Sequence, residues 1–109
     1  TTTLDQGNDK LQVKTGNRTI DIDKGNHDLT VKMGDHSVSI KSGKSTTTAM
    51  KSIELKVGPS TIKLTPSSIE VKSPMIKIQG TATAEMKSPM TTVSGDGMLT
   101  LKGGIVMIN

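Results

Sequence analysis

The sequence of 109 residues contains no cysteine, phenylalanine, tyrosine or tryptophan. Without cysteine, neither a disulfide bond nor a thiolate metal site can stabilise the fold. Aromatic side chains fill much of an ordinary protein core, and only 31% of the residues here are hydrophobic, which disfavours a conventional globular domain. The composition therefore predicts either a disordered chain or a core so narrow that Val, Ile, Leu and Met fill it.

Two kinds of segment are also missing. No run approaches the roughly 20 apolar residues that a membrane-spanning helix needs. The N-terminus, TTTLDQGNDK, has neither the basic start nor the apolar run of a signal peptide. Because the chain starts at Thr1 rather than Met, we expect it to be a fragment whose missing N-terminal part holds the attachment point and other domains.

The net charge is +4, from 14 basic and 10 acidic side chains. The lysines are mixed with Asp and Glu along the chain, and there are no arginine clusters or aromatic platforms of the kind that bind nucleic acids. We therefore interpret the charges as a solvated strand face and expect no nucleic-acid partner.

A nine-residue repeat occupies residues 8–43. Each unit starts with Asn or Asp, carries two apolar residues separated by one polar residue, and ends in Gly: NDKLQVKTG, NRTIDIDKG, NHDLTVKMG and DHSVSIKSG. Gly followed by Asn or Asp favours a turn, and apolar residues two positions apart lie on one face of a strand. Each unit is therefore predicted to be a short strand and a corner, which cannot bury its apolar face alone.

The pattern then changes. Residues 44–52 lack the apolar pair and predict a transition, after which residues 53–80 form heptapeptide repeats with the strands IELKV, TIKLT, SIEVK and MIKIQ. Pro59, Pro66 and Pro74 lie between these strands, where a fixed φ and a missing N–H suit a corner. Residues 81–109 are less regular and are expected to hold distal strands and the tip. The whole chain, 1–109, is predicted to be one β-helical needle domain.

Two aliphatic residues per seven to nine positions are too few to fill a single-chain parallel β-helix. They suit a three-sided prism in which each chain adds one strand and turns to the next face, so that three intertwined chains leave no lateral sheet edge. The predicted fold is all-β, a homotrimeric intertwined triple-stranded β-helix. The expected trimer core consists of the apolar pairs: Leu11, Val13, Ile20, Ile22, Leu29, Val31, Val38, Ile40, Leu55, Val57, Ile62, Leu64, Ile69, Val71, Ile76 and Ile78.

These repeats and the ending LTLKGGIVMIN resemble the C-terminal β-helical spike of VgrG, the valine-glycine repeat protein of the bacterial type VI secretion system. That family is similar to the cell-puncturing needles of contractile phages. The resemblance implies a structural, membrane-puncturing spike at the tip of a contractile injection apparatus, which delivers effectors into target cells. It also implies assembly in the bacterial cytoplasm and secretion by the apparatus to the exterior or into the target cell.

The same resemblance implies the partners: two further copies of the chain in a homotrimer, a tip protein with Pro-Ala-Ala-Arg (PAAR) repeats, secreted effectors, and a tube protein bound through the missing N-terminal part. The target-cell membrane would be contacted transiently. By position, the tip protein would meet the last strands, with Leu99, Leu101, Ile105, Met107, Ile108 and Asn109 as candidates. An equal alternative is that these residues only close the core.

Other sites are not expected. His27 and His36 occupy the same place in adjacent repeats, but they lie at predicted corners and lack a His-x-His spacing. The acids Asp21, Asp28 and Asp35 do not recur at one calcium-ligand position. No spacing suggests a Ser, His and acid set. We therefore expect no metal, no cofactor and no enzymatic activity.

A second function fits the repeats almost as well, namely a trimeric fibre or adhesin stalk that displays a separate binding domain. A stalk is expected to continue into a receptor-binding head, whereas a spike is expected to stop in a compact tip, as this sequence does at Asn109.

Overall fold

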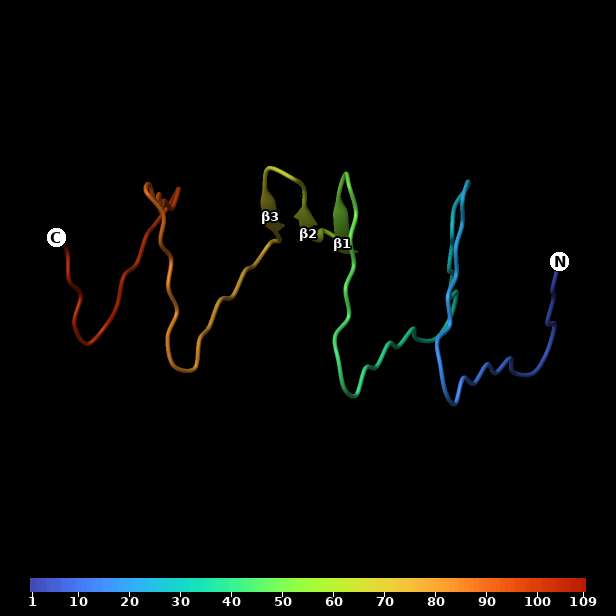
Figure 1. The fold of residues 1–109 in the computed structure, drawn as a ribbon. Helices are drawn as coiled ribbons and strands as arrows, with labels where there is room; N and C mark the ends of the chain where they lie inside the picture. The colour runs from blue at the N-terminus through green and yellow to red at the C-terminus, as the bar shows by residue number, and fades with distance from the viewer. The chain divides into compact units, whose positions relative to one another are not determined.

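The computed structural model describes residues 1–109 and contains strands but no helix. The prediction of an all-β chain is confirmed. The chain divides into two units, Thr1–Ser45 and Thr46–Asn109, and this boundary lies inside the segment 44–52. The three strands, β1 (Ile53–Val57), β2 (Ser60–Leu64) and β3 (Ile69–Lys72), belong to the second unit (Figure 1).

In the first unit the backbone bends once in every nine residues. Each bend ends in a glycine with a φ between 96 and 121°: Gly7, Gly16, Gly25, Gly34 and Gly43. Such positive φ values are strained for residues with a Cβ atom but not for glycine. The glycine corners therefore lie where the sequence pattern puts them, and the backbone conformation explains why the residue is glycine.

The exposed fractions of the apolar pairs in residues 1–45 also recur from one nine-residue repeat to the next. In all four nine-residue repeats, the first residue of the pair is 58–72% exposed and the second is 45–47% exposed. The sequence predicts a strand in each unit, yet none is paired here. A strand needs a neighbour for its N–H and C=O groups, and the bends at the corners bring no second strand of the same unit alongside.

The strands of the second unit form one antiparallel sheet in the order β1-β2-β3. Gly58, with a φ of 54°, and Pro59 connect β1 to β2. A glycine at positive φ followed by a proline with φ fixed at about −65° suits a type II′ hairpin turn. Between β2 and β3, the Thr65 N–H donates to the Ser68 carbonyl at 2.9 Å, and the Ser68 N–H donates to Thr65 Oγ1 at 3.1 Å.

The register of this sheet separates apolar from polar residues. Cross-strand partners on the apolar face form two rows, with Val57 beside them: Leu55, Ile62 and Val71; Ile53, Leu64 and Ile69. The opposite face carries Glu54, Lys56, Thr61, Lys63, Glu70 and Lys72. The predicted apolar pairs of these strands therefore share one face, as the alternation of side chains along a strand requires.

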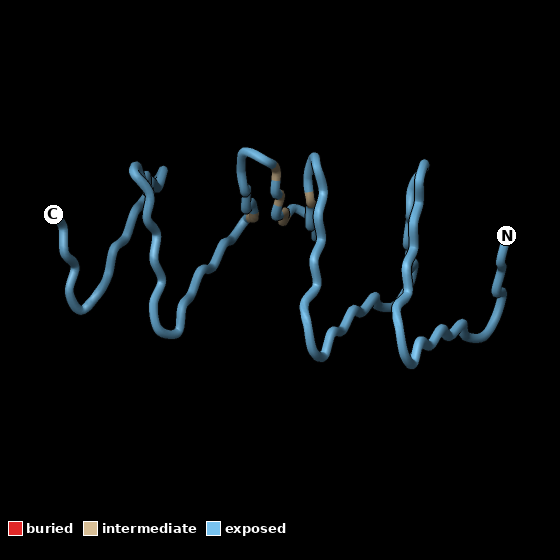
Figure 2. Tube along the Cα trace, viewed as in Figure 1, coloured by how far each residue is buried: buried red, intermediate tan, exposed pale blue.

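No residue of the chain is buried, and only a few positions in and around the sheet are half-buried (Figure 2). Even Ile62 and Leu64, in the central strand, are 41% and 38% exposed. The solvent-accessible surface is 12360 Å², whereas a compact protein of this mass exposes about 5,800 Å² and an unfolded chain about 17,000 Å². The single chain therefore has no hydrophobic core.

The corners stay regular beyond Gly80, where the sequence pattern predicts less regular ones. Bends recur alternately seven and eight residues apart, near positions 59, 66, 74, 81, 89, 96 and 104. This spacing aligns three units, residues 66–80, 81–95 and 96–109, which read PSSIEVKSPMIKIQG, TATAEMKSPMTTVSG and DGMLTLKGGIVMIN. A Cβ atom on Gly80 or Gly95 would collide with the carbonyl oxygen three residues later, of Thr83 or Met98. The distal part is therefore a 15-residue repeat.

Candidate functional site

The apolar face of the sheet is the first candidate interaction surface. Its central row, Leu55, Ile62 and Val71, is 62%, 41% and 54% exposed. Beside this row lies a hollow of about 320 Å³, lined mainly by apolar side chains, which include Met75 and Ile76 from the segment after β3. A single chain thus leaves a continuous aliphatic surface uncovered, and this surface includes most of the predicted core residues from residues 53–80.

Hydroxyl groups hold the segment that borders this hollow. Ser60 Oγ and Ser73 Oγ lie 3.0 Å apart and share a hydrogen bond, which ties the start of β2 to the residue after β3. Ser73 Oγ also accepts a hydrogen bond from the Met75 N–H at 3.4 Å. The chain after β3 therefore turns at Pro74 in a defined position beside the apolar face.

The polar face carries charges of alternating sign across the sheet. Glu54 lies opposite Lys63, and Lys63 lies opposite Glu70, an arrangement that favours this register by roughly 0.2–1 kcal/mol per pair. The one ion pair of the structure runs along β1, from Lys56 Nζ to Glu54 Oε1 at 3.6 Å, with side chains 66% and 41% exposed. Such an exposed pair contributes little to stability, and the face as a whole suits contact with water.

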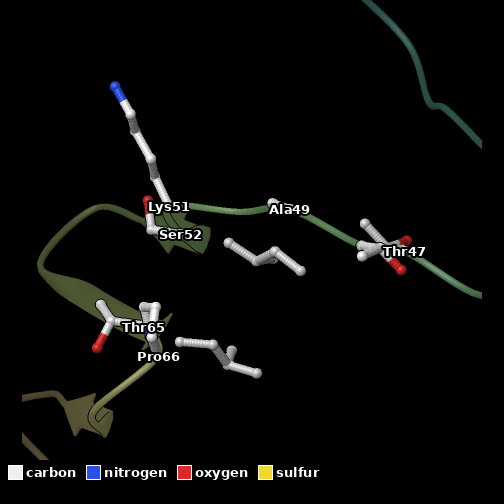
Figure 3. Close-up of a pocket in the computed structure, with 9 residues that line it drawn as sticks. Thr47, Ala49, Lys51, Ser52, Thr65 and Pro66 are labelled. Carbon is white, nitrogen blue, oxygen red and sulfur yellow. The ribbon is translucent and has the colours of Figure 1, made fainter.

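A second hollow, of about 390 Å³, lies between the segment before β1 and the end of β2 (Figure 3). Thr47, Ala49 and Ser52 line it on one side, and Thr65 and Pro66 on the other. Its only titratable group belongs to Lys51, whose side chain points away from the other labelled side chains in Figure 3. The hydroxyls here have no imidazole or carboxylate beside them among the lining residues, so the hollow lacks a set for acid–base chemistry.

No group of three or more His, Asp or Glu side chains lies close enough together in this chain to hold a metal ion. His27 and His36 lie at the same position of two successive nine-residue repeats. The structure also has no helix of a length and hydrophobicity that would cross a membrane.

The predicted tip residues all fall in the third 15-residue unit, outside any paired strand. Aligning the units matches Leu99, Leu101 and Ile108 with Ile69, Val71 and Ile78. These three candidates therefore take the places of the apolar pairs. Asn109 matches Gln79, directly after a pair.

Ile105 and Met107 differ from the other tip candidates. Ile105 takes the place of Met75 and Met90 next to the corner, and the three side chains are 85%, 81% and 84% exposed. Met107 takes the place of Lys77, and exposure alone does not separate it from Ile108, since the two side chains are 89% and 86% exposed. Since side chains alternate along an extended chain, Ile105 and Met107 lie on the side opposite Ile108. Ile108 thus shares its side of the chain with the second residue of the apolar pairs, whereas Ile105 and Met107 do not.

Met75 and Met90 were not among the sequence-predicted site residues. The signal that marks them is the tetrapeptide KSPM, which occurs at residues 72–75 and 87–90 with the bends of the 15-residue repeat around it. The corner residue is Pro in the first two 15-residue repeats and Gly in the third, so the period is difficult to recognise in the sequence.

Comparison of the chain with protein-family models, with curated proteins and with solved structures found no match. The functional interpretation therefore depends on the sequence pattern and on the geometry described above.

Proposed function

We propose that this chain is the shaft of a homotrimeric, membrane-puncturing spike, the β-helical needle at the tip of a bacterial type VI secretion apparatus. Three copies assemble around one axis, with their nine-residue repeats intertwined, and bury their apolar pairs against one another. The observation that supports this most strongly is a backbone that bends at regular intervals while no residue is buried. Regular strands with apolar faces and no core of their own need another chain.

The exposed surface is large enough for such an assembly. A compact trimer of this mass would expose about 13,000 Å² in total, or about 4,300 Å² per chain, against 12360 Å² for the single chain. The difference, about 8,000 Å² per chain, exceeds the roughly 2,000–5,000 Å² of an obligate interface, so a stable trimer needs to bury only part of it. Copies of the same chain are the simplest partners, because identical chains carry the same apolar pairs in the same order.

The charged strand face supports the same role. Glu54, Lys63 and Glu70 form a row on the face opposite the apolar pairs, so closing the prism would leave them in water. Charged side chains along the strands also hinder lateral pairing with other molecules. In this role the chain acts by its shape and strength, without a cofactor or a catalytic residue.

The proposal includes the path and the partners of the spike. The trimer assembles in the bacterial cytoplasm and leaves through the contracting apparatus, with the tube protein attached to the part of the protein that precedes this chain. Ile105 and Met107 are the proposed contacts of a PAAR-repeat tip protein, and effectors travel with the spike. The target-cell membrane is contacted only during puncture.

The first test is the solution mass of this chain by analytical ultracentrifugation together with its far-ultraviolet circular dichroism. We expect a β-rich, elongated species near three times 11.5 kDa. A folded monomer at micromolar concentration would contradict the proposal.

The second test separates the spike from an adhesin stalk. In the bacterium that encodes the protein, removing residues 53–109 from the full-length protein should abolish the release of the tube protein and of effectors into the medium. Lys63→Gln, on the charged face, is the matched control and should leave release unchanged. A stalk would give the opposite pattern, with adhesion lost and tube-protein release intact.

A further inference from the structure

We infer that residues 53–72 do not intertwine in the assembled spike. Each copy instead supplies its whole β1–β2–β3 sheet as one face of the prism, and the same sheets of the two other copies cover its apolar side. This inference rests on the proposed trimer and specifies which strands pair within a chain and which surface meets another copy.

The backbone of the central strand is the first reason. β2 pairs along one edge with β1 through five residue pairs and along the other edge with β3 through four. In a fully intertwined shaft, strands of other copies would need these same N–H and C=O groups. Intertwining here would therefore require the chain to break both ladders before it assembles.

The connections of the sheet favour pairing within one chain. Gly58 and Pro59 suit a tight II′ hairpin, and the backbone bond between Thr65 and Ser68 closes the second connection at 2.9 Å. The hydroxyl bond from Ser60 joins the residue after β3 to the start of β2. The turn residues, the strand register and the side-chain hydrogen bonds thus all favour the same local structure. Such consistency is typical of a sequence that specifies that structure.

The side chains agree with this register on both faces. Aliphatic residues stand opposite one another in the rows that contain Ile62 and Leu64, and the charges of Glu54, Lys63 and Glu70 alternate on the other face. A slip of one residue would move the aliphatic residues of the slipped strand to the charged face. The first unit contains no intrachain strand pair, so its nine-residue repeats remain free to intertwine.

The occupant of the apolar face follows from its chemistry. The two cross-strand rows hold only Ile, Leu and Val, and covering such an apolar face gains about 25 cal/mol for each Å² removed from water. Three identical aliphatic faces around a threefold axis cover one another without burying a charge. The hollow between Val71 and Ile76 can then receive an aliphatic side chain from the neighbouring copy.

A disulfide across the hairpin tests this pairing. Glu54 and Lys63 are directly opposite, so their Cβ atoms lie about 4.5–5.5 Å apart, near the separation that a disulfide spans, about 3.5–4.5 Å. The chain has no cysteine of its own, so the designed bridge is the only disulfide that the double variant Glu54→Cys/Lys63→Cys can form within one chain. The variant is oxidised in the full chain at high dilution, and then its mass is measured after concentration, with and without reductant.

We expect the oxidised chains, each with its internal bridge, to reach the same trimer mass as the reduced chains. Trimers that form only after reduction would overturn the inference, and so would disulfides between chains when the variant is oxidised after assembly. If the parent and the reduced variant are both monomeric, the proposed trimer itself is wrong, and this inference fails with it. That result is distinguishable from failure of the sheet pairing alone.

The matched control is Glu54→Cys/Glu70→Cys. These positions lie on the same face but are separated by β2, so they are about 9–10 Å apart, beyond the Cα separation of about 7 Å that a disulfide tolerates. We expect no internal bridge in this variant. A bridge that formed as readily as in the test variant would show that the sheet does not exist in solution.

Discussion

Replacing Ile62 by Asp separates the stability of the single chain from that of the assembly. Ile62 lies in the central strand, opposite Leu55 on one side and Val71 on the other. Its side chain is 41% exposed in the single chain, so a carboxylate there keeps contact with water. In the proposed trimer the same position faces the axis, together with its two copies.

The free-energy cost of Ile62→Asp is much smaller in the single chain than in the trimer. In the single chain Ile62→Asp removes cross-strand contacts of about 0.2–1 kcal/mol each. In the trimer it buries three unpaired carboxylates near one another, each at about 3 kcal/mol or more. The sum, about 9 kcal/mol, corresponds to a loss of about six factors of ten in the association constant of the trimer.

Sedimentation at a series of concentrations measures the effect, with circular dichroism as a check on strand content. Thr61→Asp is the matched control, because it adds the same charge one residue away, opposite Lys56 and Lys72 on the polar face. We expect Thr61→Asp to trimerise like the parent and Ile62→Asp to remain monomeric. Equal association by the two variants would refute the assignment of the apolar face to the interior.

Two further substitutions probe the corners. Gly25→Ala should destabilise each chain by about 1–2 kcal/mol through its backbone alone, since Gly25 has a φ of 105° and no atom lies within 4 Å of the place that the alanine methyl would take. Gly97→Ala, equally open but without a positive φ, should leave the melting temperature unchanged, and equal melting of both variants would contradict the corner geometry. Thr65→Val removes the Oγ1 acceptor of the Ser68 N–H at 3.1 Å and should cost about 1 kcal/mol. Amide hydrogen exchange at Ser68 should then accelerate. The control Thr92→Val should leave this exchange rate unchanged. An unchanged rate in Thr65→Val would show that the bond does not form in solution.

Much of the local structure could be predicted because it depends on neighbouring residues. The corners at Gly16 and Gly25 follow from the spacing of glycine and from its tolerance of positive φ. The common face of Ile62 and Leu64 follows from alternation along a strand. The positions of Pro59 and Pro66 in the connections follow from their missing N–H.

Other features escaped prediction because they depend on residues far apart or on chemically different corners. The sequence shows apolar pairs at Leu55, Ile62 and Val71 but not that these residues stand opposite one another. The 15-residue period is hidden because Pro89 in the second unit corresponds to Gly104 in the third. The bends reveal it, since a bend depends on the backbone and not on which residue provides it.

The sequence by itself determined the class of the chain, the places of the corners and which residues of a strand share a face, because φ preferences and side-chain alternation act over a few residues. Only the tertiary structure decided that β1, β2 and β3 pair within one chain, with β2 in the centre. It also decided that this pairing leaves every apolar residue at least partly exposed. Strand pairing and burial depend on which segments contact one another in space, and local preferences do not specify those contacts.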